Sequence, residues 1–265
     1  MPAIVVLVKN VPDTWSAKSL KQDYTLDRES VDNVLDEVNE YAVEQALQLR
    51  DSLDNSEVVA LSVAPNNGQE ALRKALAMGA DRAIQVADEA LAGSDIMGTA
   101  WVITNALNLV DDIALIIAGQ ASSDGAMGAL PGILAEYRSC PALTSCTEVK
   151  LSGATVTATR QTHSGIWEVE AQIPAVISVT DQADKPRFPN FKGIMAAKKA
   201  EIPVYSLEDI GVAAEQVGLA HAATRITHAV SRGVRGRGET IYGDADTQAE
   251  AVVEFLAARN LLTRN

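Results

Sequence analysis

The residues best suited to bind a ligand lie near the middle of the chain. The apolar stretch Ile113–Ala118 leads into Gly119-Gln-Ala-Ser-Ser-Asp-Gly-Ala-Met-Gly. Three glycines let the backbone turn tightly and approach a ligand closely. We expect Ser122, Ser123 and Asp124 to cap the helix that follows, whose free N–H groups and dipole attract a phosphate. The stretch therefore predicts a phosphate-binding loop, with an ordinary glycine-rich connection as the alternative.

Other chemical motifs are missing from the sequence. There is no G-x-x-x-x-G-K-[ST] and no G-x-G-x-x-G after the first strand, which favours a mononucleotide over a dinucleotide or triphosphate. His163, His221 and His228 have neither a paired nucleophile nor metal-ligand spacing, and Cys140 and Cys146 form no C-x-x-C pair. We expect no catalytic residue, no metal site and two free thiols.

Apolar runs and helical patterns alternate around this loop. The runs typical of buried strands are Ile4–Val8, Val58–Val63, Ala83–Val86, Ala114–Ala118 and Ala175–Val179. Helical periods begin at Asp36, cover Gln69–Met78 and Ser94–Leu109, and follow the loop, with Pro131 in the first turn. This alternation predicts βαβ units and a parallel sheet. The loop then lies outside the carboxyl end of a strand, where open α/β sheets bind ligands.

The pattern changes after Pro141. Residues 147–151, 155–160 and 166–171 alternate polar and apolar side chains, which is typical of half-exposed antiparallel strands. We therefore predict an α/β fold with an open parallel sheet, flanking helices and an antiparallel strand extension.

The end of the chain reads differently again. From Leu207 the periodicity is weak until an amphipathic helix at Gln248–Leu262. A long irregular segment in a compact chain usually wraps something. We predict an α/β domain over residues 1–206 and a C-terminal arm over 207–265 that docks on a partner subunit.

Composition narrows the class of function. The 265 residues are 47% hydrophobic but only 4% aromatic, and the net charge is −13. Such an acidic chain is repelled by nucleic acid and by anionic lipid. The apolar run near Met1 is too short for a signal peptide or a membrane span. We expect a cytoplasmic protein without nucleic-acid binding or membrane insertion.

A second surface is indicated by residues 186–199. This segment combines prolines, Phe188 and Phe191 with Ile194, Met195 and several lysines. Exposed together, the apolar side chains would form an adaptable protein-binding knob. The alternative is a short helix whose apolar side faces the core, and the residues by themselves favour neither.

Four stretches in order resemble the beta subunits of electron-transfer flavoproteins of the actinobacterial form. They are Val-Lys-Asn-Val-Pro-Asp-Thr (8–14), Leu-Asp-Glu-Val-Asn-Glu-Tyr-Ala-Val-Glu-Gln-Ala-Leu (35–47), Arg-Lys-Ala-Leu-Ala-Met-Gly-Ala-Asp-Arg-Ala (73–83) and Pro-Arg-Phe-Pro-Asn-Phe-Lys-Gly-Ile-Met-Ala-Ala-Lys-Lys (186–199). The resemblance runs from Ile4 to about Val212, and the tail beyond has no counterpart that we can place.

This resemblance implies an electron carrier, not an enzyme. The fold would be of the adenine-nucleotide-binding type, in a heterodimer whose alpha subunit holds the redox-active FAD while the beta subunit holds a structural AMP. Acyl-CoA and related dehydrogenases would donate electrons, and electron-transfer flavoprotein-quinone oxidoreductase would accept them.

The resemblance also assigns residues. Thr14 or Trp15 would approach the flavin of the alpha subunit, and Phe191, Ile194 and Met195 would dock dehydrogenases. The AMP-binding residues would be Leu7, Asp36, Glu37, Val38, Asn39, Val63, Gly119, Gln120, Ala121, Ser122, Ser123, Asp124, Gly125, Ala126, Met127, Gly128, Ala129 and Leu130.

One departure bears on the type of flavoprotein. Flavin-bifurcating relatives, which hold a second FAD, typically carry an Asp-Gly-Asp-Thr-type loop. Here the run is Ser-Ser-Asp-Gly-Ala-Met-Gly, one residue longer and with Met127 in place of Thr. The loop therefore favours a non-bifurcating member with AMP. Two other classes stay open, a stand-alone adenine-nucleotide-binding regulatory module and an enzyme acting on an adenylate.

Overall fold

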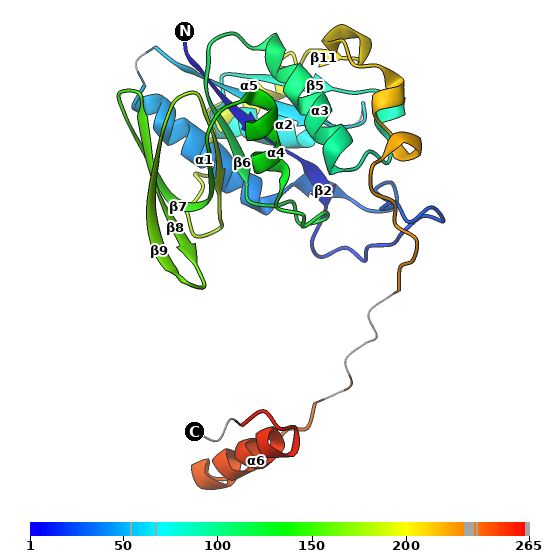
Figure 1. Cartoon of the computed structure of the whole chain (residues 1–265), viewed down its shortest axis with the longest axis vertical. Helices are drawn as coiled ribbons and strands as arrows, with labels where there is room; N and C mark the ends of the chain where they lie inside the picture. Colours follow the sequence, from blue (N-terminus) through cyan, green and yellow to red (C-terminus); the bar gives the residue numbers. More distant parts are fainter. Residues whose placement is uncertain (54, 67, 231–235, 237, 263–265) are drawn as a thin grey trace. The chain divides into compact units, whose positions relative to one another are not determined.

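The apolar runs form the middle of one sheet in the computed structural model, which describes residues 1–53, 55–66, 68–230, 236 and 238–262 (Figure 1). Within these residues the sheet has nine strands in the order β11-β5-β4-β1-β6-β10-β7-β8-β9. Five inner strands of the sheet pair parallel with one another: β1 (Ala3–Leu7), β4 (Glu57–Val63), β5 (Arg82–Val86), β6 (Ile113–Gly119) and β10 (Ala175–Val179). The edge strand β11 (Val204–Tyr205) pairs parallel with β5. All residues of β1 and β10 are buried, as expected for strands covered on both faces.

The predicted antiparallel strands are confirmed, and they extend this same sheet. β7 (Ala142–Ser152) pairs parallel to β10, and β8 (Thr155–Thr162) and β9 (Gly165–Gln172) follow it as antiparallel strands. His163 and Ser164 form the turn between β8 and β9. The polar–apolar alternation arises because the two faces of this extension differ in burial.

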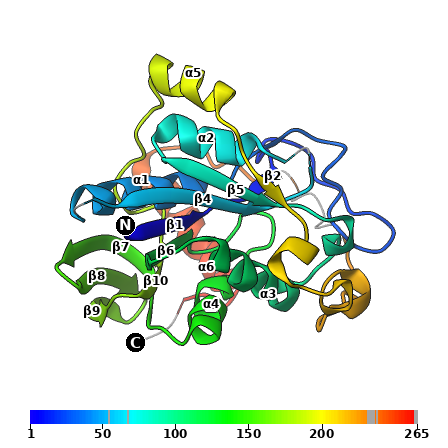
Figure 2. The ribbon, with the colours of Figure 1, turned by 90° about the horizontal axis from the view of Figure 1, so that it is seen from above.

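Helices cover both faces of the parallel strands, as predicted. On one face lie α1 (Glu37–Asp51) and α2 (Glu70–Met78), and on the other lie α3 (Ile96–Ala106) and α4 (Leu130–Arg138) (Figure 2). Successive side chains of a strand point to opposite faces. Ile4 and Val6 of β1 therefore pack in the core beneath α1 and α2, whereas Val5 and Leu7 pack in the core beneath α3 and α4.

Some boundaries differ from the sequence-based expectation. Residues 10–12, expected in a loop, form β2 (Asn10–Pro12), which pairs antiparallel with β3 (Asn33–Leu35). The two strands are too short and too far apart in the sequence to show a pattern. The α3 helix begins after Asp95, whose side chain accepts from the N–H groups of Met97 and Gly98, and it passes into a 3₁₀ turn.

The chain divides into two units, Met1–Thr227 and His228–Asn265. The first includes the opening part of the predicted arm, where Leu207, Ile210 and Val212 are buried. Its short 3₁₀ helices are η1 (Glu89–Leu91), η2 (Leu107–Leu109), η3 (Glu208–Ile210), η4 (Ala214–Gln216) and η5 (Leu219–His221). Weak periodicity hid this packing, because only isolated apolar residues are buried.

The second unit contains one helix in its described part, α6 (Ala245–Ala258). Asp244 caps it by accepting from the N–H of Thr247 at 2.9 Å. The helix begins and ends earlier than the predicted Gln248–Leu262. Residues 231–235, 237 and 263–265 of the predicted arm lie outside the described residues.

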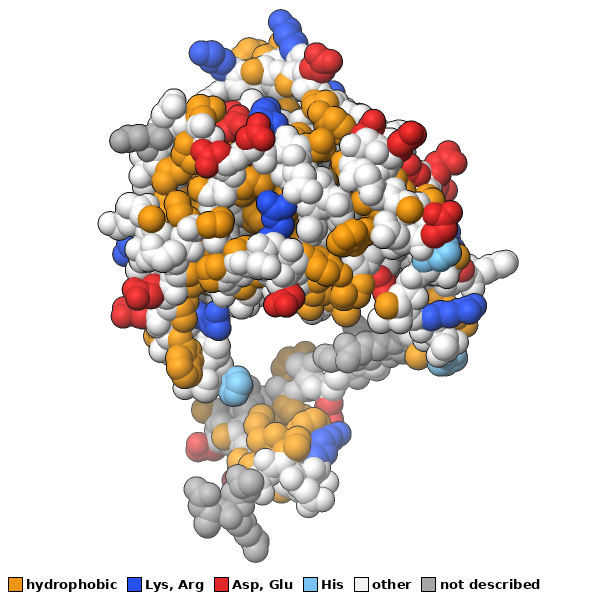
Figure 3. Space-filling model, turned by 45° about the horizontal axis from the view of Figure 1, so that its top comes forward, with side chains coloured by type: hydrophobic (Ala, Val, Ile, Leu, Met, Phe, Trp, Pro, Cys, Tyr) orange, Lys and Arg blue, Asp and Glu red, His pale blue; other side chains and the backbone are white. Residues whose placement is uncertain are grey.

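Acidic side chains are spread across the face of the molecule seen in Figure 3, in keeping with the net charge of −13. In the described part of the chain, no helix combines the length and apolar character needed to cross a bilayer. The same residues contain no group of three His, Cys, Asp or Glu side chains placed to share a metal ion. Cys140 and Cys146 are free, and burial raises the pKa of the Cys146 thiol to about 11.

A buried glutamine fixes the turn after β4. The Gln85 side chain is fully buried on β5, and its Nε2 donates to the carbonyl of Pro65 at 2.7 Å and of Ala64 at 3.3 Å. Its Oε1 accepts from Gln69 Nε2 at 3.0 Å. Buried polar groups are stable only when they are paired. Gln85 therefore holds the turn that follows Val63 in place.

We predict that Gln85→Leu lowers the free energy of unfolding by about 1–3 kcal/mol, because the two carbonyls and Gln69 lose their buried partner. Urea unfolding monitored by circular dichroism measures the change. The control is Gln172→Leu, on exposed edge strand β9, where the effect is expected to stay within about 0.5 kcal/mol. Equal losses in the two variants would contradict a structural role for Gln85.

Candidate functional site

The predicted nucleotide residues meet at one edge of the sheet. β1 pairs with β4 on one side and with β6 on the other, and both pairs are parallel. The chain leaves β1 toward β4 through α1 and reaches the opposite side only at β6. Ligands bind at such a switch point in open α/β sheets, outside the carboxyl ends of the strands. Leu7, Val63 and Gly119 are the last residues of these three strands.

The start of α1 packs directly against the end of β6. A Cβ atom at Gly119 would lie 2.6 Å from Val38 Cγ1 and 2.9 Å from Asn39 Nδ2. Only glycine leaves room for this approach. Asn39 Oδ1 in turn accepts from the backbone N–H of Lys9 at 2.9 Å. The Asp36–Asn39 segment, the end of β1 and the start of the loop are thus in contact.

The loop leads to a helix without a side-chain cap. Ala129 occupies the N-cap position of α4, and the predicted capping by Ser122, Ser123 or Asp124 is wrong. Ser122 Oγ accepts instead from the N–H of Gly125 at 3.2 Å, within the loop. Within the described residues, the N–H groups of Gly128 and Ala129 make no hydrogen bond. Free amides at a helix start are what a phosphate needs.

Asp124 joins the loop to two cations. Its side chain is only 2% exposed, yet one oxygen accepts from Lys9 Nζ at 2.8 Å and the other pairs with the guanidinium of Arg28. Burial alone would raise the pKa of this carboxyl. The charges of Lys9 and Arg28 outweigh burial and hold the pKa far below its usual range. Asp124 is therefore ionised and anchored at neutral pH.

A second carboxylate, that of Asp36, also contacts the loop. Asp36 is almost fully buried, with 1% of the residue exposed. Its Oδ2 accepts a hydrogen bond from the backbone N–H of Ser123 at 2.7 Å. Burial raises the pKa of Asp36, and the nearby charge of Asp124 adds to this rise, while the Ser123 hydrogen bond opposes it. The loop is thus held by the carboxylate of Asp36, just before α1, and by its own Asp124, which pairs with Lys9 and Arg28.

Sequence reasoning missed the two cations at this site. Lys9 follows the first strand, so its place at the carboxyl end of a strand was a usable signal. Arg28 lies in the segment between β2 and β3 and gave none. Its Nη1 donates to the carbonyl of Asn10 at 3.2 Å, and Asn33 Nδ2 donates to the carbonyl of Arg28 at 2.7 Å. Only the folded chain brings Arg28 to Asp124.

Thr14 and Trp15 lie in the same segment as Arg28, outside the sheet. Trp15 is 95% exposed. The backbone N–H of Trp15 donates to Asp13 Oδ1 at 3.0 Å, and Lys18 Nζ donates to the carbonyl of Thr14 at 3.4 Å. These contacts fix the turn but leave the indole ring uncovered.

The predicted docking residues form a separate surface on α5 (Phe191–Lys199), which packs over α2 (Figure 2). Phe191 is 80% exposed, and Phe188, Ile194 and Met195 are exposed as well. Ala197 is the single buried residue of this helix. The alternative of a helix with its apolar side in the core is wrong, and the exposed arrangement is confirmed.

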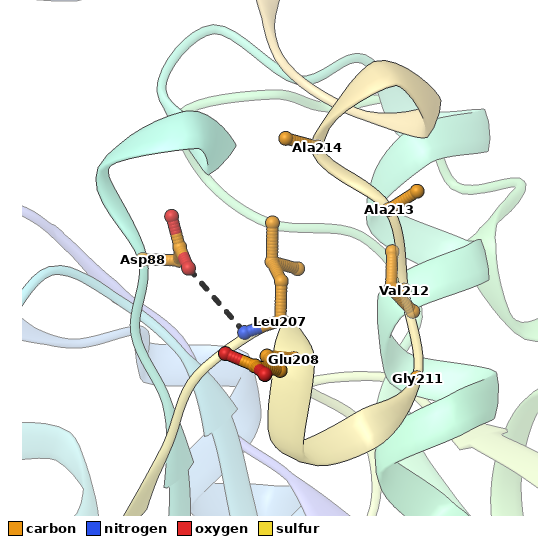
Figure 4. A pocket seen from close by; sticks show the side chains of 7 residues that line it. All are labelled: Asp88, Leu207, Glu208, Gly211, Val212, Ala213 and Ala214. Carbon is orange, nitrogen blue, oxygen red and sulfur yellow. Dashed lines mark hydrogen bonds between the residues drawn. The ribbon is translucent and has the colours of Figure 1, made fainter.

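One hollow lies away from the predicted nucleotide residues. Its volume is about 410 Å³, and Figure 4 shows its lining by Asp88, Leu207, Glu208, Gly211, Val212, Ala213 and Ala214. Asp88 uses its carboxylate to accept from Ala90 N–H at 2.9 Å and from Leu207 N–H at 3.4 Å. The carboxylates of Asp88 and Glu208 would repel a phosphate. This hollow is therefore a poorer phosphate site than the 119–130 loop.

Comparison with known proteins gives a consistent result over the chain. A model of the electron transfer flavoprotein domain matches residues 23–210. The chain is 44% identical to electron transfer flavoprotein subunit beta of Mycobacterium tuberculosis, across 99% of this chain and 100% of that protein. The protein of the same name in Mycobacterium leprae is 43% identical with the same coverage. The Caffeyl-CoA reductase-Etf complex subunit CarD of Acetobacterium woodii is 30% identical across 98% and 99%.

These alignments also cover the tail beyond Val212, for which the four sequence stretches gave no counterpart. The tail is therefore shared with the mycobacterial relatives and is not an addition peculiar to this chain.

We predict that Asp124→Asn lowers the free energy of unfolding by about 1–3 kcal/mol at neutral pH, because the hydrogen bonds of Lys9 and Arg28 lose their charged acceptor. The folded pKa of Asp124 is depressed. Its contribution is therefore present above the unfolded carboxyl pKa of about 4 and is lost as pH falls toward the folded pKa.

Urea unfolding at neutral pH and at about pH 3 tests both parts of this prediction. The difference between the original chain and the Asn variant is expected to shrink in acid. Asp111→Asn, which changes an exposed carboxylate, serves as the control. A difference that stays constant or grows in acid would show that Asp124 is not stabilised as an anion.

Proposed function

This chain belongs to the electron transfer flavoprotein family, among its beta subunits, and on that premise we propose that it works in a heterodimer that carries electrons between other enzymes. An alpha subunit would hold most of the FAD site, and FAD would supply the redox chemistry. The beta chain would bind, orient and shield, and it needs no acid, base or nucleophile for this. Full-length similarity to beta subunits is the observation that carries the proposal.

We propose AMP as the nucleotide at the 119–130 loop. The free N–H groups of Gly128 and Ala129 and the partly exposed ammonium of Lys9 suit a single phosphate. The Asp36–Asn39 segment, with Leu7 and Val63, would take the adenosine side. The Leu7 side chain is buried in the core, so its contact would come from the backbone.

We further propose that the heterodimer is non-bifurcating, so that no second FAD is held by the beta chain. The loop run Ser-Ser-Asp-Gly-Ala-Met-Gly supports this.

Two further surfaces complete the proposal. The uncovered indole of Trp15, with Thr14, would lie against the flavin of the alpha subunit. The exposed residues Phe191, Ile194 and Met195 would dock acyl-CoA and related dehydrogenases as donors, with electron-transfer flavoprotein-quinone oxidoreductase as the acceptor. Exposed apolar clusters of this kind mark protein-binding sites.

The C-terminal arm would complete the contact with the alpha subunit. Within the second unit, α6 buries none of its described residues, and Val252, Val253 and Phe255 are exposed. A helix of this kind gains stability chiefly by packing against another surface. We propose that the alpha subunit provides that surface.

We predict that heat-treated beta chain, purified with its alpha partner, releases AMP, and that FAD accompanies the alpha subunit. Mass spectrometry of the released nucleotides tests this. Gly128 has φ +66°, so Gly128→Val strains the loop and is expected to lower the AMP content. Gly153→Val, at φ +59° in the β7–β8 turn, is the matched control. FAD released from the beta chain itself would overturn the AMP assignment.

We predict that Phe191→Ala raises the KM of an acyl-CoA dehydrogenase for the flavoprotein by about 10-fold or more, as loss of an aromatic anchor does. AMP and FAD contents are expected to stay unchanged. Stopped-flow reduction of the FAD measures the effect, and Ile166→Ala, an exposed apolar change on β9, is the control. Unchanged reduction kinetics would rule out docking through Phe191.

A further inference from the structure

The helix that carries the docking residues has little hydrophobic anchorage. α5 buries only Ala197, and its largest apolar side chains point outward. Burial of apolar area is the usual source of helix stability in proteins. The position of α5 must therefore depend on other contacts.

The first of these contacts is an ion pair just before the helix. Arg187 donates from Nε to Glu44 Oε2 at 2.7 Å and from Nη2 to Oε1 at 2.9 Å. Its backbone N–H also donates to Oε2 at 3.0 Å. Glu44 lies on α1 with a side chain 7% exposed. Burial would raise the pKa of Glu44, but the bonds from Arg187 outweigh it and lower the pKa.

The second contact lies at the other end of the helix. Arg73 of α2 donates from Nη1 to the carbonyl of Ala197 at 2.8 Å and of Ala200 at 3.4 Å. These carbonyls have no intrahelical partner at a helix C-terminus, where a cation is also favoured by the dipole. Gln69 Oε1 holds the same guanidinium by accepting from Nη2 at 3.1 Å.

Between the two contacts the backbones touch. A Cβ atom at Gly193 would lie 2.5 Å from the carbonyl oxygen of Ala77 on α2. Asn190 caps the helix by accepting from Gly193 N–H at 2.8 Å. The backbone of the first turn of α5 therefore contacts the last turn of α2 directly, with no side chain between them at Gly193.

We propose that Glu44, Arg187 and Arg73 are positioning residues that hold the docking face in its binding geometry before a dehydrogenase arrives. The inference rests on the proposed docking role of α5. A preorganised face binds more tightly because little ordering is left for the moment of association. Glu44 and Arg73 act from α1 and α2, and neither has to touch the dehydrogenase. Their loss affects encounter and binding, whereas the rate of electron transfer in the formed complex is retained.

The test uses the FAD-containing heterodimer and a purified acyl-CoA dehydrogenase. Arg187→Gln and Arg73→Gln are each expected to raise the KM for the flavoprotein by about 3- to 10-fold, the equivalent of ordering one or two side chains, with kcat nearly unchanged. Arg187→Lys keeps the charge but loses the two-bond geometry, and it is expected to restore only part of the affinity. Hydrogen exchange of residues 191–199 is expected to quicken in both Gln variants.

A matched control is present in the fold. Arg82 also makes two hydrogen bonds to one carboxylate: its Nε donates to Glu57 Oε2 and its Nη2 to Glu57 Oε1, each at 3.0 Å. Glu57 and Arg82 are the first residues of β4 and β5, so this pair lies at the end of these strands opposite to the carboxyl ends. Arg82→Gln is expected to change thermal stability without changing the KM. If Arg82→Gln raises the KM as much as Arg187→Gln does, general destabilisation explains the result and the positioning role fails.

Double variants separate positioning from direct contact. In a Phe191→Ala background, Arg187→Gln is expected to have much less effect, because the side chain it positions is gone. Fully additive effects would show that Arg187 acts independently of Phe191, which overturns the inference. Arg73→Gln leaves no buried carboxylate unpaired and keeps the test available where Arg187→Gln fails to assemble.

The two levels of the proposal fail differently. No effect of Phe191→Ala would remove the docking role and the inference together. An effect of Phe191→Ala, with unchanged KM in both Arg187→Gln and Arg73→Gln, would remove the positioning role alone.

Discussion

The pairing of β1 with a parallel strand on each side is the constraint on which the candidate site depends. Because all three strands run the same way, their carboxyl ends share one edge of the sheet. The start of α1 and the loop after β6 therefore meet at this edge, where Ser123 N–H donates to Asp36. Gly119 permits the close approach of Val38 and Asn39 to the end of β6. The residues proposed for AMP come together at this edge, where the hydrogen bonds of Asp36 and Asn39 join the segments.

Buried carboxylates position both proposed functional surfaces. Asp124 forms an ion pair with Arg28, which lies in the same segment as Trp15. Glu44 forms an ion pair with Arg187, which lies in the same segment as Phe191. Each segment has little apolar area to bury, so charge and hydrogen-bond geometry supply what hydrophobic packing cannot. Such a pair contributes only when both partners are present, because a buried charge left alone is costly. In this acidic chain, Arg28 and Arg187 therefore stabilise the fold through ion pairs with buried carboxylates.

The errors of sequence-based prediction have a common physical origin. Ser122, Ser123 and Asp124 are good capping residues by type, but nearer partners compete for them. Asp124 meets Lys9 and Arg28, and Ser122 bonds within its own turn. The β2–β3 ribbon and the buried residues of 207–227 escaped prediction because few residues form each contact. Local pattern is informative only where a segment is long enough to repeat it.

The sequence by itself determined the parallel strands, the antiparallel extension, the glycine loop and the membership of a family. Each of these rests on periodicity or on a run of consecutive residues, which a linear chain displays directly. Only the tertiary structure decided that Phe191 is exposed, that Arg28 reaches Asp124, and that Arg187 reaches Glu44. Those contacts join residues about a hundred positions apart or more, and their energy depends on burial. Neither distance in space nor burial is written in any local stretch of the chain.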